Sequence, residues 1–141
     1  MIVSKWWFIF TAWFMSLIAM LGSLFFSEVL QYPPCTLCWY QRICMYPLSV
    51  ILLTGLFPLE RVVLKFSLPL TFVGWLISVY HNLLYYKILP ESAGPCLKGI
   101  SCTTVFINWW GFITIPLLSF ISFSLILILL FFSWRSFERE K

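Results

Sequence analysis

Charged side chains are scarce in this sequence. Only 10% of its 141 residues are Asp, Glu, Lys or Arg, whereas 62% are hydrophobic. A soluble domain carries about 25% charged residues, because water must solvate most of its surface. The missing polar coat excludes an ordinary soluble domain and predicts that lipid covers most of this chain.

Positive charge is sparse as well. Nine Lys and Arg residues against five Asp and Glu give a net charge of +4, and the basic residues are scattered along the chain. A nucleic-acid face gathers its basic residues on one surface, where they neutralise phosphates, so we expect no nucleic-acid partner. Internal repeats, low-complexity tracts and signs of a second domain are also missing. Residues 1–141 are therefore expected to form a single domain.

Long apolar stretches are what the sequence has instead. A bilayer core of about 30 Å requires about 20 apolar residues in a helix. Four stretches reach that length, at residues 6–26, 39–57, 68–86 and 111–132. We predict an all-α membrane protein, a bundle of four transmembrane helices with loops at 27–38 and 87–110. The first stretch could instead be a cleaved signal peptide, but it exceeds the usual length of such a core and no Ala-x-Ala site follows it.

The basic residues predict the orientation of these helices, because cytoplasmic segments carry an excess of Lys and Arg. The loops at 27–38 and 87–110 contain only Lys87 and Lys98. Six basic residues lie instead at the chain ends or in the middle loop: Lys5, Arg61, Lys65, Arg135, Arg139 and Lys141. We therefore expect both termini in the cytoplasm and the two cysteine-bearing loops outside.

Cys35 and Cys38 form a C-x-x-C motif where the first outer loop meets the second predicted helix. A helix N-terminus favours negative charge, and so does the fixed positive charge of Arg42, one turn beyond Cys38. Both effects lower the pKa of a thiol and favour its reactive thiolate form. The motif therefore predicts a redox-active pair on the outer side.

Cys96 and Cys102 lie in the second outer loop, with five residues between them. They are close enough in sequence to close a small disulfide loop. Two static disulfides are the alternative function for the four outer cysteines, because structural disulfides are common outside the cell. A zinc site is a further alternative, although zinc-binding pairs are usually two to four residues apart. Cys44, inside the second predicted helix, is expected to be a small buried hydrophobic residue.

Arg42 and His81 lie near the outer ends of the second and third predicted helices. Ionisable residues inside a bilayer are costly and usually mark function. Arg42 always donates hydrogen bonds, and His81 can donate, accept and move a proton. Such a pair suits a lipophilic molecule with carbonyl oxygens that takes up two electrons and two protons, which describes a quinone. Snorkelling of Arg42 to the lipid headgroups and an interhelical hydrogen bond of His81 are the structural alternatives.

The stretch at residues 34–42, which reads PCTLCWYQR, resembles the signature of the DsbB family of disulfide-bond-forming membrane oxidoreductases. The short second cysteine loop and residues 107–116 resemble the Gram-positive, BdbC-like branch of that family. The resemblance covers essentially the whole chain. It implies a bacterial plasma-membrane enzyme, a disulfide-generating thiol:quinone oxidoreductase with its active cysteines on the extracytoplasmic side.

The same resemblance implies an electron relay. An extracytoplasmic thioredoxin-fold thiol oxidase, DsbA-like or BdbD-like, would deliver its reduced cysteines to the second outer pair. Cys96 would form the mixed disulfide with this partner, and Cys102 would then exchange with Cys35. Cys38 would pass the electrons to a quinone from the membrane pool, and exported proteins would receive the disulfides.

The resemblance also places Arg42 and His81 beside the quinone. A Gram-positive origin implies menaquinone, with ubiquinone as the alternative. The second cysteine loop is shorter than in Gram-negative members, and Cys44 has no role in the family pattern. Two other functions compete with this one. A vitamin K epoxide reductase homologue would carry its loop cysteines before the C-x-x-C motif, and a tetraspanin-like scaffold would leave Arg42 behind Cys38 without a reason.

Overall fold

The computed structural model describes residues 2–57, 60–90, 102 and 114–139. These residues form four long helices and no strand: α1 (Ile2–Leu24), α2 (Thr36–Leu56), α3 (Arg61–Tyr85) and α4 (Ile115–Glu138). A π-helical turn, η1 (Phe25–Val29), continues α1. The predicted all-helical chain with four long helices is confirmed.

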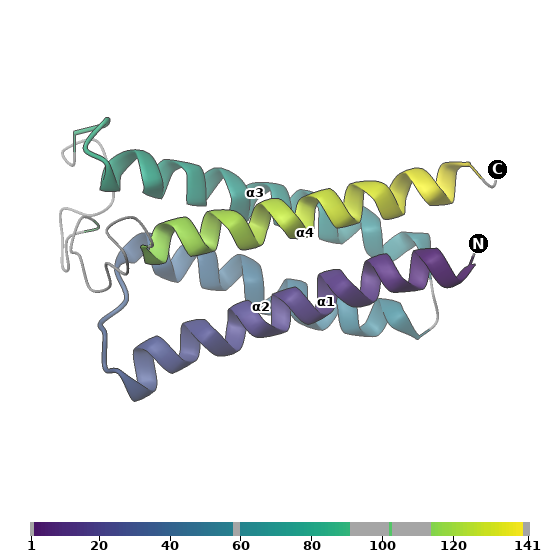
Figure 1. Cartoon of the computed structure of the whole chain (residues 1–141), viewed down its shortest axis with the longest axis horizontal. Helices are drawn as coiled ribbons and strands as arrows, with labels where there is room; N and C mark the ends of the chain where they lie inside the picture. Colours follow the sequence, from purple (N-terminus) through teal and green to yellow (C-terminus); the bar gives the residue numbers. More distant parts are fainter. Residues whose placement is uncertain (1, 58–59, 91–101, 103–113, 140–141) are drawn as a thin grey trace.

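The four helices lie side by side along one axis (Figure 1). Each packs against two neighbours, since α1 contacts α2 and α4, and α3 contacts the same two helices. The start of α1 and the end of α4 lie at one end of the bundle, together with the end of α2 and the start of α3 (Figure 1). The start of α2, which carries the C-x-x-C motif, lies at the opposite end.

Three segments of the described chain are long and apolar enough to cross a membrane: Val3–Val29, Arg61–Tyr85 and Ile115–Glu138. The helix α2 is not among them, because polar residues such as Gln41 and Arg42 interrupt its first half. Gln41 is buried and Arg42 is half-buried, so this polarity is directed into the bundle and not outward. That all four helices cross a bilayer, with both termini in the cytoplasm, stays a prediction.

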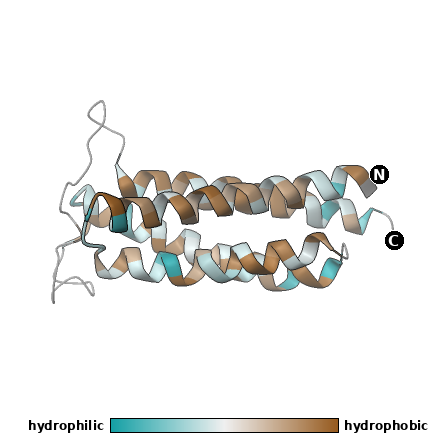
Figure 2. Ribbon diagram, turned by 90° about the horizontal axis from the view of Figure 1, so that it is seen from below, coloured by the Kyte–Doolittle hydropathy of each residue, from teal (hydrophilic) through white to brown (hydrophobic). Residues whose placement is uncertain are grey.

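Hydrophobic residues predominate along the helices (Figure 2), and large apolar side chains are exposed on each of the four. One example on each helix is Phe14, Val50, Phe66 and Phe132, which are 48%, 61%, 63% and 54% exposed. A water-soluble monomer rarely exposes apolar area on this scale. The surface is therefore suited to contact with lipid.

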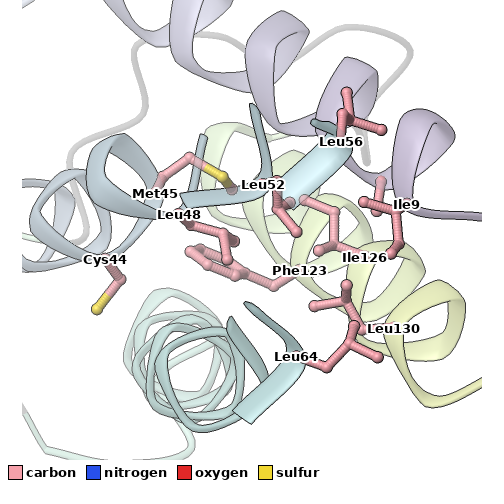
Figure 3. Packing of buried hydrophobic residues seen from close by; sticks show 11 residues of the cluster. Ile9, Cys44, Met45, Leu48, Leu52, Leu56, Leu64, Phe123, Ile126 and Leu130 are labelled. Atoms are coloured by element: carbon pink, nitrogen blue, oxygen red, sulfur yellow. The ribbon is translucent and has the colours of Figure 1, made fainter. Parts of the chain in front are cut away.

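The main core lies between the helices and is apolar (Figure 3). Leu48 and Leu52 of α2 meet Phe123 and Ile126 of α4, and all four are almost completely buried. Gly74 of α3 makes this packing possible, because a Cβ atom there would collide with the ring of Phe123. Cys44 is buried in the same cluster as a free thiol, which agrees with its expected role as a small hydrophobic residue.

The helix α3 begins before the apolar stretch at 68–86, and α4 continues beyond the stretch at 111–132 although it begins at Ile115. Hydrophobicity marks the part of a helix that suits lipid, whereas backbone hydrogen bonding continues into flanking polar turns. The first turn of α3 is held against the last turns of α4: Arg61 donates to Glu138 at 3.3 Å, and its guanidinium lies 4.5 Å from the ring centroid of Trp134. These contacts join the two helices at the end of the bundle remote from the cysteines.

Candidate active site

The C-x-x-C motif forms the beginning of α2. Cys35 is the N-cap residue of this helix, and its sulfur accepts a hydrogen bond from the backbone N–H of Cys38 at 3.4 Å. The two sulfur atoms are 2.9 Å apart, and both cysteines are free thiols. Pro33 and Pro34 precede them and favour an extended backbone before the helix begins. The structure therefore places the motif at a helix N-terminus, as the sequence indicates.

His81 reaches this motif from α3. Its side chain is buried, and its Nε2 atom lies 3.7 Å from the sulfur of Cys35. On the other side of the ring, Nδ1 lies 3.3 Å from the side-chain nitrogen of Gln41. The hydroxyl of Ser119 on α4 donates to the side-chain oxygen of Gln41 at 2.9 Å. A chain of polar contacts thus crosses three helices and ends on a thiol.

The contacts of Cys35 change its acidity. Contacts with the Cys38 thiol, which contribute most, and with His81 together lower the pKa of Cys35 to about 4, although burial opposes them. In the reduced pair, Cys35 is therefore a thiolate at neutral pH. The sequence indicated an activated thiol through the helix N-terminus and Arg42, whereas the structure adds two direct contacts.

Arg42 is bound to the end of α1. Its Nε atom donates to the hydroxyl of Ser23 at 2.9 Å, and a terminal nitrogen donates to the Ser23 carbonyl oxygen at 2.8 Å. The guanidinium also lies 5.6 Å from the ring centroid of Trp39. A guanidinium carries five N–H donors, so these two bonds leave donors for a ligand. The π-helical turn η1 follows Ser23 closely, and such turns are frequent at functional sites.

A pocket of about 290 Å³ adjoins the cysteines and receives residues from all four helices. The predicted site residues among the described part of the chain all line it: Cys35, Cys38, Arg42, His81 and Cys102. Most other lining residues are apolar, and no described one is a carboxylate. The hydroxyl of Tyr46, which also lines the pocket, is buried without a hydrogen-bond partner among the described residues. Apolar walls with few polar groups are typical of small-molecule sites.

Cys102 lies beside the C-x-x-C motif. It is buried in one cluster with Cys35, Leu37 and Leu84, and it is disulfide-bonded. The structure therefore brings a cysteine of the second loop to the first pair, as an exchange between the pairs requires. Cys96 lies outside the described residues, so its predicted role stays a prediction.

Three of these residues offer a set of possible metal ligands. The ligand atoms of Cys35, Cys38 and His81 all lie within 4.8 Å of one another. Zinc accepts such a set of two thiolates and one imidazole. A metal on Nε2 would require the proton of His81 on Nδ1, opposite a hydrogen-bond acceptor. Gln41 presents its amide nitrogen there, so the arrangement favours thiol chemistry, and the predicted lack of a metal stays a prediction.

Gln41, Ser119 and Tyr46 were not identified from the sequence as site residues. Gln41 does carry a signal, because it is a strongly polar residue next to Arg42 within an apolar helix. Ser119 and Tyr46 carry none, since serine and tyrosine are ordinary residues in membrane helices. Their part in the site depends on which faces of α2 and α4 meet.

Comparisons with known proteins show the family of this chain. The family described as "Disulfide bond formation protein DsbB" matches residues 4–133. The Disulfide bond formation protein C of Bacillus subtilis (strain 168) is 48% identical over 123 residues, which cover 86% of this chain and 88% of that protein. The Probable disulfide formation protein C of Halalkalibacterium halodurans is 45% identical over 117 residues, covering 83% and 85%. No solved structure matches the chain. The resemblance noted in the sequence is confirmed, and the chain belongs to the DsbB family of disulfide bond formation proteins.

Proposed function

We propose that the protein is a membrane thiol:quinone oxidoreductase that reoxidises an extracytoplasmic thioredoxin-fold thiol oxidase, DsbA-like or BdbD-like. In this way it supports disulfide formation in exported proteins. The observation that carries the proposal is that Cys35 and Cys38 adjoin both the disulfide-bonded Cys102 and an apolar pocket with Arg42 at its wall.

The first part of the reaction is thiol–disulfide exchange. The two thiols of the partner become a disulfide, and the Cys96–Cys102 disulfide takes up their two electrons as it is reduced. The Cys102 thiolate then attacks the sulfur of Cys35 in an oxidised Cys35–Cys38 pair and releases Cys38 as a thiolate. Attack of Cys96 on Cys102 releases Cys35 and restores the second pair. The burial of Cys102 in one cluster with Cys35 supports this order.

The second part oxidises the Cys35–Cys38 dithiol. A bound quinone would supply a two-electron, two-proton acceptor in the pocket. The pocket suits such a molecule, because its walls are mostly apolar and the Tyr46 hydroxyl, which has no partner among the described residues, can donate to a carbonyl oxygen. Arg42 would donate to the same ligand through its remaining N–H groups. Cys38 lines the pocket and is the more exposed cysteine of the pair, so we assign to it the delivery of the electrons.

We propose a single four-helix domain in the bacterial plasma membrane, with spans near 6–26, 39–57, 68–86 and 111–132. The cysteines would lie on the extracytoplasmic side and both termini in the cytoplasm. The separation of the cysteine end of the bundle from the chain ends supports this orientation (Figure 1). Menaquinone from the membrane pool is the proposed acceptor, with ubiquinone as the alternative.

Anaerobic quinone reduction by the purified protein in lipid, fed with a reduced thioredoxin-fold oxidase, tests the proposal. We expect one quinol for each disulfide formed in the partner and complete loss of quinol in Cys38→Ala. Cys44→Ala is the matched control, because Cys44 is a free cysteine of the same helix that packs in the apolar core. Failure of the wild type with a competent quinone and partner would overturn the proposal and favour a scaffold with static disulfides.

A further inference from the structure

The side-chain amide of Gln41 has a defined orientation between Ser119 and His81. Its side-chain oxygen accepts from the hydroxyl of Ser119, so its amide nitrogen faces Nδ1 of His81. An amide nitrogen only donates, and a neutral imidazole carries one proton. Nδ1 therefore accepts, and the proton of the ring lies on Nε2, the atom that faces the sulfur of Cys35.

The opposite direction does not suit a neutral imidazole beside a thiolate. If the amide of Gln41 were turned around, its oxygen would accept from Nδ1–H, and Nε2 would present a lone pair to Cys35. A lone pair repels a thiolate, whereas Nε2–H donates to it. The direction observed matches donors with acceptors at every step from Ser119 to the Cys35 sulfur.

We infer that Gln41, held by Ser119, fixes His81 in the Nε2–H tautomer, so that His81 donates a hydrogen bond to the sulfur of Cys35. Gln41 is thus a positioning residue, which acts through His81 and needs no contact with a ligand. The tautomer follows from the contacts alone, and only the role of this hydrogen bond in the relay rests on the proposed function.

The other charged and titratable groups near His81 do not account for the orientation of its ring. From α2, the groups that line the pocket are Cys35, Cys38, Arg42 and Tyr46, and α3 adds Tyr85. Tyr32 lies before α2, Cys102 is disulfide-bonded, and α1 and α4 contribute only serines as polar groups from within the helices. No described lining residue is a carboxylate, and the described polar partners of the ring are the Gln41 amide beside Nδ1 and the Cys35 sulfur beside Nε2. A neutral amide therefore sets the orientation of the ring.

The hydrogen bond assists steps in which Cys35 is released. Thiol–disulfide exchange is faster when the leaving sulfur is the more stable thiolate. Cys35 leaves in this form when Cys96 attacks the Cys35–Cys102 intermediate of the proposed relay. Gln41 transfers neither a proton nor an electron in this step, because it only keeps the donor of His81 directed at the sulfur.

The tautomer can be measured directly, because His81 is the single histidine of the chain. Nitrogen-15 NMR of histidine-labelled, reduced protein at pH 8 reports this ring alone. We expect the Nε2–H tautomer in the wild type and a shift toward Nδ1–H in Ser119→Ala and Gln41→Met. Ser122→Ala is the matched control, because Ser122 also lines the pocket but donates to the Leu118 carbonyl of its own helix.

A second measurement follows alkylation of Cys35 against pH by peptide mass spectrometry. We expect the midpoint of the wild type near pH 4. In Ser119→Ala and Gln41→Met the midpoint should rise by about one pH unit, the size expected when a hydrogen bond to a charged group is weakened. Ser122→Ala should not move it.

Two results would overturn the inference: Nδ1–H in the wild type, or the same tautomer and midpoint in Ser119→Ala, Gln41→Met and Ser122→Ala. Neither measurement involves a quinone or a partner protein. Failure of the inference therefore leaves the proposed function standing, and failure to form quinol in a protein with the expected tautomer counts against the proposed function alone.

Discussion

The two halves of the bundle interior are built differently. The half that contains Leu52 and Ile126 holds the main cluster of buried apolar side chains, with buried hydroxyls such as those of Ser67 and Ser133 between the helices. The half that contains Cys35 and His81 has polar side chains joined across three helices, and it contains a pocket of about 290 Å³. The residues that stabilise the fold and the residues that are reactive are thus separated along the axis of one small bundle. Substitutions in one half should therefore leave the properties of the other largely unchanged.

The largest expected contrast is in thiol reactivity. The lowered pKa of Cys35 keeps it a thiolate from alkaline pH down to about 4, and the thiolate is lost only as the pH falls through that value. The alkylation rate of Cys35 in reduced, folded protein should therefore be flat between pH 5 and 8. In unfolded protein the rate should rise about a thousandfold over that range, as the thiolate fraction of an ordinary thiol does.

Cys44 extends this comparison to the apolar half. It is a free cysteine that is 5% exposed, the same value as Cys35, but it lies in the main core. Alkylation of Cys44 should be undetectable in folded protein throughout the same pH range. A steep pH profile for folded Cys35, or equal labelling of both cysteines, would contradict the separation of the two halves.

In the apolar half, Leu52→Ala should destabilise the fold strongly. Leu52 is completely buried, and truncation of such a residue costs about 2–5 kcal/mol through lost contacts and the cavity left behind. Titration with a denaturing detergent measures the change. Leu53→Ala is the control, because its side chain is 46% exposed and should lose little. The pH profile of Cys35 should persist in both variants under folding conditions.

In the polar half, Arg42→Ala should weaken quinone use without unfolding the protein. The KM for quinone should rise on the order of tenfold to a hundredfold, the effect of losing a charged hydrogen-bond donor. Steady-state quinone reduction measures it. Arg61→Ala, at the remote end of the bundle, should keep the wild-type KM. Equal effects of the two substitutions would show that Arg42 acts through the general fold.

The smallest effect is expected for Tyr46→Phe. This change removes a buried hydroxyl without a partner among the described residues. The KM for quinone should rise by about threefold to tenfold, corresponding to one neutral hydrogen bond. Stability should be unchanged or slightly higher, since no internal hydrogen bond is lost. Tyr40→Phe, on the exposed face of the same helix, is the control, and an unchanged KM in Tyr46→Phe would remove this hydroxyl from the proposed site.

Sequence reasoning identified the four helices because each contains a long apolar stretch. It also identified Cys35 and Cys38 at a helix start, since proline and the C-x-x-C spacing are local signals. Local patterns predicted less well how polar residues pair across helices. That His81 lies beside a quinone stays a prediction, whereas its contact with the Cys35 sulfur through Nε2 was not expected from the sequence.

The contacts of Ser119 and Ser23 illustrate the reason. Both serines lie in apolar helices, where nothing in the neighbouring sequence distinguishes them from other serines. Ser119 meets Gln41, and Ser23 meets Arg42, because of the rotation of α4 and α1 about their own axes. That rotation is set by packing of the whole bundle, including the fit of Phe123 against Gly74. A single sequence read along one helix does not contain it.

Phe123 belongs to both halves, since it is buried in the apolar core and also lines the pocket. Its ring fits against Gly74, and a Cβ atom at that position would collide with it. The open space beside the ring is the pocket. A side chain at position 74 would thus displace the ring of Phe123 toward the pocket. Room for a ligand at this site therefore depends on the absence of a side chain at position 74, which is not itself among the described residues that line the pocket.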